Sequence, residues 1–112
     1  MTITVSVLIP AKIAEATQTT QYTSSGVKTI IDKFTATNYS GSAATISVNL
    51  VTTAGTAGNS NLITKTKTLQ PSEVYTFPEL VGQVLNDGDF ISTLAGTATA
   101  INIRSSGRQI SS

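Results

Sequence analysis

Hydrophobic and polar residues alternate along most of this chain, and the alternation is clearest between residues 28 and 51. Successive side chains on a β-strand point to opposite faces, so residues two apart share a face. In the run KTIIDKFTATN this period places Ile30, Phe34 and Ala36 together. In the run AATISVNLV it places Ala44, Ile46, Val48 and Leu50 together, with polar residues between them. Both runs are therefore predicted to be half-buried strands.

Residues 39–42 separate these two strands and carry turn chemistry. Asn38 and Gly41 belong to the residue types that tolerate a positive φ angle. Two alternating runs joined by such a short segment predict a β-hairpin.

The first residues also alternate, with Ile3, Val5, Val7 and Ile9 on one face of a predicted strand 2–9. Pro10 is expected to end this strand, because proline has no N–H to donate. Residues 12–17 are too few for a stable helix and predict a second strand or an extended connection. A short strand is expected at 21–23.

The second half of the chain alternates between strands and turns. Residues 54–61, AGTAGNSN, predict a loop that is either a plain hairpin connection or a tip that contacts a partner. In the strand 62–69, Lys65 and Lys67 either protect a sheet edge or meet an acidic partner, and edge protection is favoured. Leu80, Val81, Val84 and Leu85 have helical spacing, which predicts one short helical turn. Further strands are expected at 74–77 and at 90–95, with turns before them at 70–73 and 86–89. The last strand is expected from residue 97 or 98 to residue 104, and Gly107 is expected to end it.

The pattern amounts to eight or nine short strands with turn signals about every 8–12 residues, a spacing typical of sandwiches and barrels. We therefore predict an all-β fold: a single antiparallel β-sandwich or jelly-roll-like domain of about eight short strands over residues 1–112. A chain of 112 residues is long enough to bury a core without metal or disulfides.

The amino-acid composition excludes several classes of functional site. The chain contains no cysteine and no histidine, which excludes disulfides, thiolate nucleophiles, Cys/His zinc sites and histidine bases. Seven basic and six acidic residues give a net charge of +1 without a basic stripe, so nucleic acid is not an expected partner. Only 12% of residues are charged, and a weakly charged surface favours association. We expect no secretory signal and no membrane-spanning segment.

The polar residues predict no catalytic, cofactor or metal site. The run Asn86-Asp87-Gly88-Asp89 offers oxygen ligands to calcium but lacks the remaining ligands of an EF-hand, and a turn is favoured. Glu73 and Glu79 flank Tyr75, Phe77 and Pro78, a candidate sugar-binding patch, although solvated surface residues are the favoured interpretation. No serine or threonine has a recognisable activating partner. A non-enzymatic protein is expected.

Three segments of the chain follow a recognisable order of strands and turns: QYTSSGVKTIIDKFTATNYSGSAATISVNLV, LQPSEVYTFPELVGQVLNDGDFIS and ATAINIRSSGRQI. Their order of strands and turns, over about residues 21–110, resembles that of short bacteriophage virion structural proteins. Ser24-Ser25 stands where alanine-proline is more usual in such proteins. The resemblance implies a capsid decoration or cement protein on the virion exterior, made in the host bacterial cytoplasm. A phage tail, fibre or adhesin accessory protein is the first alternative, and a carbohydrate-binding β-sandwich module is the second.

On the decoration hypothesis, the expected partners are the major capsid protein and further copies of this chain in a dimer or trimer. Strand 2–9 and loop 54–61 are the expected contact regions. The candidate partner-contact residues are Ile3, Val5, Val7, Ile9, Thr56, Asn59 and Asn61.

Overall fold

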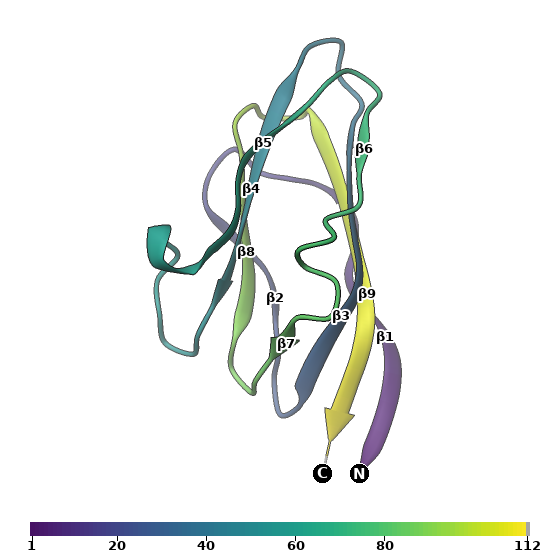
Figure 1. The fold of residues 1–112 in the computed structure, drawn as a ribbon, viewed down its shortest axis with the longest axis vertical. Helices are drawn as coiled ribbons and strands as arrows, with labels where there is room; N and C mark the ends of the chain where they lie inside the picture. Colours follow the sequence, from purple (N-terminus) through teal and green to yellow (C-terminus); the bar gives the residue numbers. More distant parts are fainter. Residues whose placement is uncertain (112) are drawn as a thin grey trace.

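The computed structural model describes residues 1–111 and consists of two antiparallel β-sheets packed face to face as a β-sandwich (Figure 1). The all-β prediction is confirmed, and over the described part of the chain the single helical element is the 3₁₀ turn η1 (Asn59–Asn61). The strands are β1 (Thr2–Ile13), β2 (Thr19–Thr23), β3 (Lys28–Asn38), β4 (Ala44–Val51), β5 (Leu62–Leu69), β6 (Val74–Tyr75), β7 (Val84–Leu85), β8 (Phe90–Ala95) and β9 (Ile101–Ser111).

Sheet A has the order β1-β9-β3-β6, and β7 also pairs with β3. Sheet B has the order β2-β8-β4-β5. The strands of both sheets run along the length of the molecule, and the start of β1 and the end of β9 project together at one end (Figure 1). Each sheet therefore has one face toward the other sheet and one face toward solvent.

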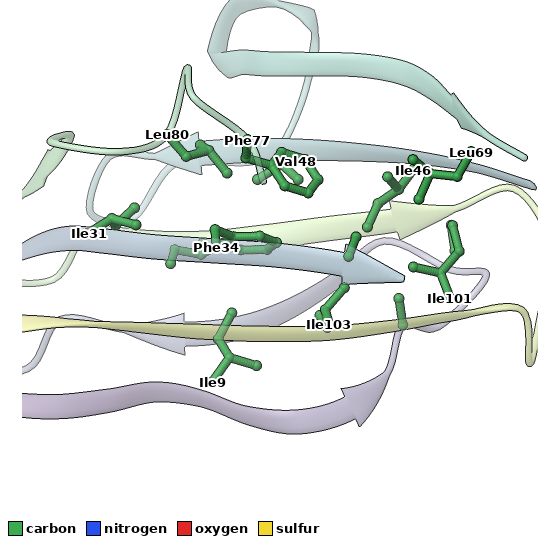
Figure 2. Close-up of a cluster of buried hydrophobic side chains, with 14 of the residues drawn as sticks. Ile9, Ile31, Phe34, Ile46, Val48, Leu69, Phe77, Leu80, Ile101 and Ile103 are labelled. Carbon is green, nitrogen blue, oxygen red and sulfur yellow. The ribbon is translucent and has the colours of Figure 1, made fainter. Parts of the chain in front are cut away.

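The core fills the space between the two sheets (Figure 2). Phe34 of β3 meets Phe77 edge-on, with ring centroids 4.8 Å apart, and both rings are fully buried. Isoleucines from sheet A and from sheet B surround this pair. Burying each such side chain stabilises the fold by roughly 1.5–3 kcal/mol, so these contacts hold the sheets together.

The predicted hairpin between β3 and β4 is wrong. β3 lies in sheet A and β4 in sheet B, so residues 39–43 cross from one sheet to the other. Neither Asn38 nor Gly41 has a positive φ angle. Alternation gives each strand one apolar face, and two such faces share a core equally well when the strands belong to opposing sheets. The pattern therefore predicted both strands but not their pairing.

Two β-bulges change which residues face the core. In β3 the register shifts between Ile31 and Lys33, so the buried residue is Ile31, while the predicted Ile30 lies on the opposite face. In β1 the register shifts between Val7 and Ile9, so Ile9 is buried although Val7 is exposed. One extra residue in a strand reverses the faces of everything beyond it, which alternation alone does not reveal.

Two predicted strand ends are also wrong. β1 continues through Pro10 to Ile13, because an edge strand tolerates a residue without an N–H. β9 continues through Gly107 to Ser111, because that glycine lies in a close approach between strands rather than in a turn.

The segment after β5 is less regular than expected. β6 contains only Val74 and Tyr75, because Phe77 has a φ angle of 45° that ends the extended conformation. No helix forms at residues 80–85: a turn with Gly82 at φ 88° leads into β7. Leu80 and Leu85 are buried there, so the apolar spacing came from a turn followed by a strand.

No helix in residues 1–111 is long and apolar enough to cross a membrane.

Candidate interaction surface

The side chains of sheet A can be assigned to its inner or outer face from hydrogen bonds that reach sheet B. Ser6 donates to the Gln109 Oε1 atom at 3.0 Å, and the Gln109 Nε2 atom donates to the Tyr22 hydroxyl at 2.8 Å. Tyr22 belongs to β2 of sheet B, so Ser6 and Gln109 point inward. Their alternate neighbours therefore point outward, away from the core.

The outer face of sheet A carries a cluster of apolar side chains at the end where β1 and β9 project, next to the exposed Lys28, which pairs with Ile110. Cross-strand pairing aligns Val5 of β1, Arg108 of β9, Ile30 of β3 and Val84 of β7 in one row. Ile3 and Ile110 pair beside this row. Val5 is 83% exposed and Val84 is 52% exposed. We call this surface the sheet A patch; it consists of Ile3, Val5, Val7, Ile30, Val84 and Ile110.

An ion pair lies within the sheet A patch. The Arg108 Nε and Nη2 atoms both donate to the Asp32 carboxylate, at 3.0 and 2.9 Å. This two-point contact fixes the planar guanidinium, and the hydrogen bond to Asp32 raises the pKa of Arg108. The patch therefore combines apolar side chains with one neutral, geometrically fixed charge pair.

The structure places the candidate contact residues in three different settings: the sheet A patch, the core and the β4–β5 connection. Ile3, Val5 and Val7 are exposed on the sheet A patch. Ile9 is fully buried beyond the bulge and is not available to a partner, which corrects its assignment as a contact. Thr56, Asn59 and Asn61 lie in the β4–β5 connection of the other sheet, so the two groups do not form one surface.

The loop at residues 54–61 is a hairpin connection held by two amide side chains. Asn49 of β4 is almost fully buried and donates to the Gly58 carbonyl oxygen at 2.9 Å and to the Asn61 Oδ1 atom at 2.6 Å. Asn61 in turn donates to the Thr56 carbonyl oxygen and accepts from the Gly58 N–H. Asn61 therefore anchors the loop, whereas Thr56 and Asn59 remain exposed.

A hollow of about 290 Å³ lies beside this loop on the outer face of sheet B, lined in part by Gln18, Ser47, Asn49 and Leu94. The Gln18 amide donates to Ser92 at 2.7 Å and to Asn49 at 3.4 Å. These polar groups bond to one another, so the hollow is explained by the network that fixes the β4–β5 connection.

The candidate sugar-binding segment is built into the core. Phe77 is fully buried, and Tyr75 packs against it with ring centroids 4.6 Å apart. The Tyr75 hydroxyl donates to the Glu79 Oε1 atom at 2.7 Å, and Thr64 of β5 donates to the other carboxylate oxygen. Burial alone would raise the pKa of Glu79, but the hydrogen bonds from Thr64 and Tyr75 lower it below its ordinary value. The hydrogen bond that Tyr75 donates to Glu79 raises the pKa of Tyr75 to about 12. Glu79 thus links the edges of the two sheets.

A pH-dependent loss of stability follows from this contact. A carboxylate whose pKa is lowered in the folded state stabilises the fold above its unfolded pKa of about 4.3, and the contribution is lost as pH falls through the folded pKa. We expect Glu79→Gln to lower the free energy of unfolding at neutral pH by about 1 kcal/mol. The difference from the unmodified protein should shrink below about pH 4. Urea titrations at several pH values measure both quantities.

Tyr75→Phe is the matched control, because it removes one donor to Glu79 and keeps the buried ring. Its pH profile should fall between those of the unmodified protein and Glu79→Gln. Parallel pH profiles for Glu79→Gln and the unmodified protein would contradict a role for the carboxylate.

The turn at residues 86–89 uses its carboxylates as backbone acceptors. Asp89 accepts from the N–H groups of Thr53 and Asn86, and Asp87 accepts from the N–H of Gly26 at 2.7 Å. The favoured turn interpretation agrees with these contacts. Across residues 1–111, no group of three or more acidic, cysteine or histidine residues is placed to hold a metal ion.

Sequence reasoning missed half of the sheet A patch. Ile30 was assigned to the core face, Val84 was assigned to a helical turn, and Ile110 lay beyond the predicted end of the last strand, because the bulges and the β3–β7 pairing have no local signal. The Arg108–Asp32 pair joins positions far apart in the chain and depends on the same register.

No family model matches this chain, and neither the curated proteins nor the solved structures include a match to it.

Proposed function

We propose that this protein is a non-enzymatic structural protein of a bacteriophage particle, a capsid decoration protein that binds the major capsid protein shell from outside and stabilises it. The sequence resemblance to short virion proteins supports this assignment. The observation that carries it is the sheet A patch, a cluster of exposed apolar side chains on the outer face of sheet A.

The physical requirements of decoration fit this surface. A protein that reinforces a shell acts by adding interface area between subunits, and the centre of such an interface is depleted in unpaired charge. In the centre of the sheet A patch the charges of Arg108 and Asp32 are already paired with each other, so a partner can cover this pair without leaving either charge unpaired. Lys28 and Lys33 lie at the margin, where they stay in contact with solvent or meet acidic groups of a partner. The exposed valines and isoleucines around them supply apolar area.

Binding to phage heads tests the proposal. Purified protein is mixed with undecorated, expanded heads of the phage that encodes it, the heads are sedimented, and bound copies are counted. We expect saturable binding at a stoichiometry compatible with capsid symmetry, and heads that resist heating better when decorated. Val84→Lys should weaken binding about tenfold or more, because it places a hydrated charge in the interface.

Tyr39→Lys provides a matched control, since Tyr39 is 51% exposed, close to the exposure of Val84, but lies in the β3–β4 crossover away from the patch. It should bind heads like the unmodified protein. Binding to tail assemblies instead of heads would replace the capsid assignment by the tail alternative. Binding to host surface glycans alone would favour the carbohydrate-binding alternative.

A further inference from the structure

The two sheets have edges that differ in how they are protected against pairing with another chain. At the outer edge of sheet B, β5 carries Lys65 and Lys67, and Thr66 between them has a φ angle of 52° and donates its N–H to the Ser47 hydroxyl. Charged side chains and irregular backbone are the usual means of blocking an edge strand. The opposite edge of sheet B, β2, is five residues long and has a register shift.

In sheet A, the edge formed by β6 and β7 is equally unsuited to pairing, because each of these strands contains two residues. The other edge, β1, is different. Residues 2–9 form a long strand with no charged residue, and within the described chain their single strand partner is β9. The register shifts of β1, together with Pro10 and Lys12, all lie beyond Val7. The outward row of peptide groups at residues 2–7 is therefore open to another strand and lacks the devices found at the other edges.

The projecting part of β1 is exposed on more than its edge. Thr2, Ile3, Thr4 and Val5 are all exposed, which means that both faces of the strand are open at this end. Figure 1 shows the start of β1 projecting with the end of β9 beyond the neighbouring strands. A strand in this position gains hydrogen bonds and side-chain contacts when a second strand pairs with it.

We propose that β1 pairs with β1 of a second copy of this chain, antiparallel about a two-fold axis through residues 3–6, so that two sheets A join into one continuous sheet. The inference goes beyond the proposed function and does not depend on it, since it rests on the edge itself. The occupant is a second copy because the strand is complementary to itself.

The strand β1 is complementary to itself because its side chains alternate between the two faces with a period of two residues. In an antiparallel pair, residues directly opposite share a face, so a two-fold register centred in residues 3–7 sets the isoleucine and valine side chains of one copy on the same face as those of the other. With Val5 on the axis, Ile3 lies opposite Val7 and Thr4 lies opposite Ser6. No register within this segment brings like charges together, and a two-fold pair closes without leaving a further free edge of the same kind. Joining the sheets also brings the two sheet A patches together on one outer face.

Single-cysteine scanning tests the geometry, because the chain has no cysteine of its own. Cysteine is placed in turn at Ile3, Thr4, Val5, Ser6 and Val7, and covalent dimer formation under mild oxidation is followed on non-reducing gels. The residue on the two-fold axis meets its own copy directly, at the Cβ separation found for cross-strand pairs. We expect the fastest disulfide formation at one of these positions, with rates that fall on both sides of it.

Val84→Cys is the matched control, an exposed valine on the same outer face but away from the β1 edge. Its disulfide formation should be slower than that of the fastest β1 variant. A rate for Val84→Cys that equals or exceeds every β1 position would overturn the proposal in favour of contact between outer faces.

Sedimentation analysis of the protein alone, over about a hundredfold range of concentration, gives the second readout. The unmodified protein should show a monomer–dimer equilibrium.

Val5→Lys should raise the dimer dissociation constant about tenfold or more, because it sets two positive charges together near the axis. Val84→Lys should leave the dimer intact while losing head binding, so failure of the dimer and failure of the decoration function are separable. A protein that stays monomeric throughout, or a Val5→Lys variant that dimerises unchanged, would overturn the pairing.

Discussion

Gly107→Ala is expected to lower the free energy of unfolding by about 3 kcal/mol, the upper range for overpacking a well-packed core. A Cβ atom at this position would lie closer to the Ile30 carbonyl oxygen than van der Waals contact allows, and 3.0 Å from the Leu8 Cδ1 atom. The first of these is a backbone atom of the neighbouring strand, so it cannot rotate away. The strands themselves would have to separate.

The close approach at Gly107 arises from the two bulges. Gly107 pairs with Ser6 on one side and Ile31 on the other, and the register of β1 and of β3 shifts just beyond these residues. Bulges increase the local bend and twist of a strand, which brings the Ile30 carbonyl against β9. A glycine in the middle of a central strand, otherwise unfavourable, is therefore required here.

Gly41→Ala is the control for Gly107→Ala. A Cβ atom at Gly41 would have no atom within 4 Å, and the φ angle there is not in the positive region. We expect a change within about 0.5 kcal/mol, possible in either direction, since alanine also restricts the unfolded chain. Urea titration of both variants gives the comparison. Equal stabilities would show that β3 does not crowd Gly107.

Asn38→Ala is expected to have the second largest effect, a loss of about 2–3 kcal/mol. Asn38 is fully buried at the end of β3, and its amide donates to the Leu69 carbonyl oxygen at 2.9 Å and to the Ser42 carbonyl oxygen at 2.8 Å. Its Oδ1 atom accepts from the N–H and the hydroxyl of Ser40. Removing the amide leaves the buried Leu69 carbonyl without this donor and frees the crossover between the sheets.

Asn38→Asp separates the loss of hydrogen bonds from the loss of volume, because the two side chains have the same shape. An aspartate here would face two carbonyl oxygens in a buried site, so its pKa should rise above the ordinary value. A raised folded-state pKa means that protonation favours the fold, so this variant should regain stability as pH falls through that pKa. The exposed Asn86→Ala serves as the control and should change stability little. A stability for Asn38→Asp that does not recover in acid would contradict the donor role of the amide.

Sequence patterns predicted the strands better than the partners of those strands. Strands 62–69 and 90–95 were predicted with the bounds that the structure has, because turn residues flank an alternating run on both sides. The β3–β4 hairpin failed because alternation is the same for paired strands and for strands that face each other across a core. Asn38 was assigned to the turn for its residue type, although its burial and four contacts belong to the core.

The candidate surface was predicted in part for a similar reason. Ile3, Val5 and Val7 share an exposed face, as a contact surface requires, but Ile9 leaves that face at the bulge and is buried. Ile30 and Val84 joined the same surface only through the register of β3 with its neighbours. Register between distant strands depends on many weak contacts and has no signature in a short stretch of sequence.

The central position of β9 in sheet A sets the order in which the fold can assemble. β1 and β3 each pair with β9 and not with each other, and Ile3 pairs with Ile110. Nearly the whole chain must close into a loop before this ladder begins, whereas the β4–β5 hairpin joins neighbouring segments. Long-range pairing of this kind slows the search for the native topology. β3 can pair with β6 and β7 before β9 is in place, but β1 has no other strand partner. The apolar residues of β1 are therefore the last to find a sheet, and until then they are available to other chains.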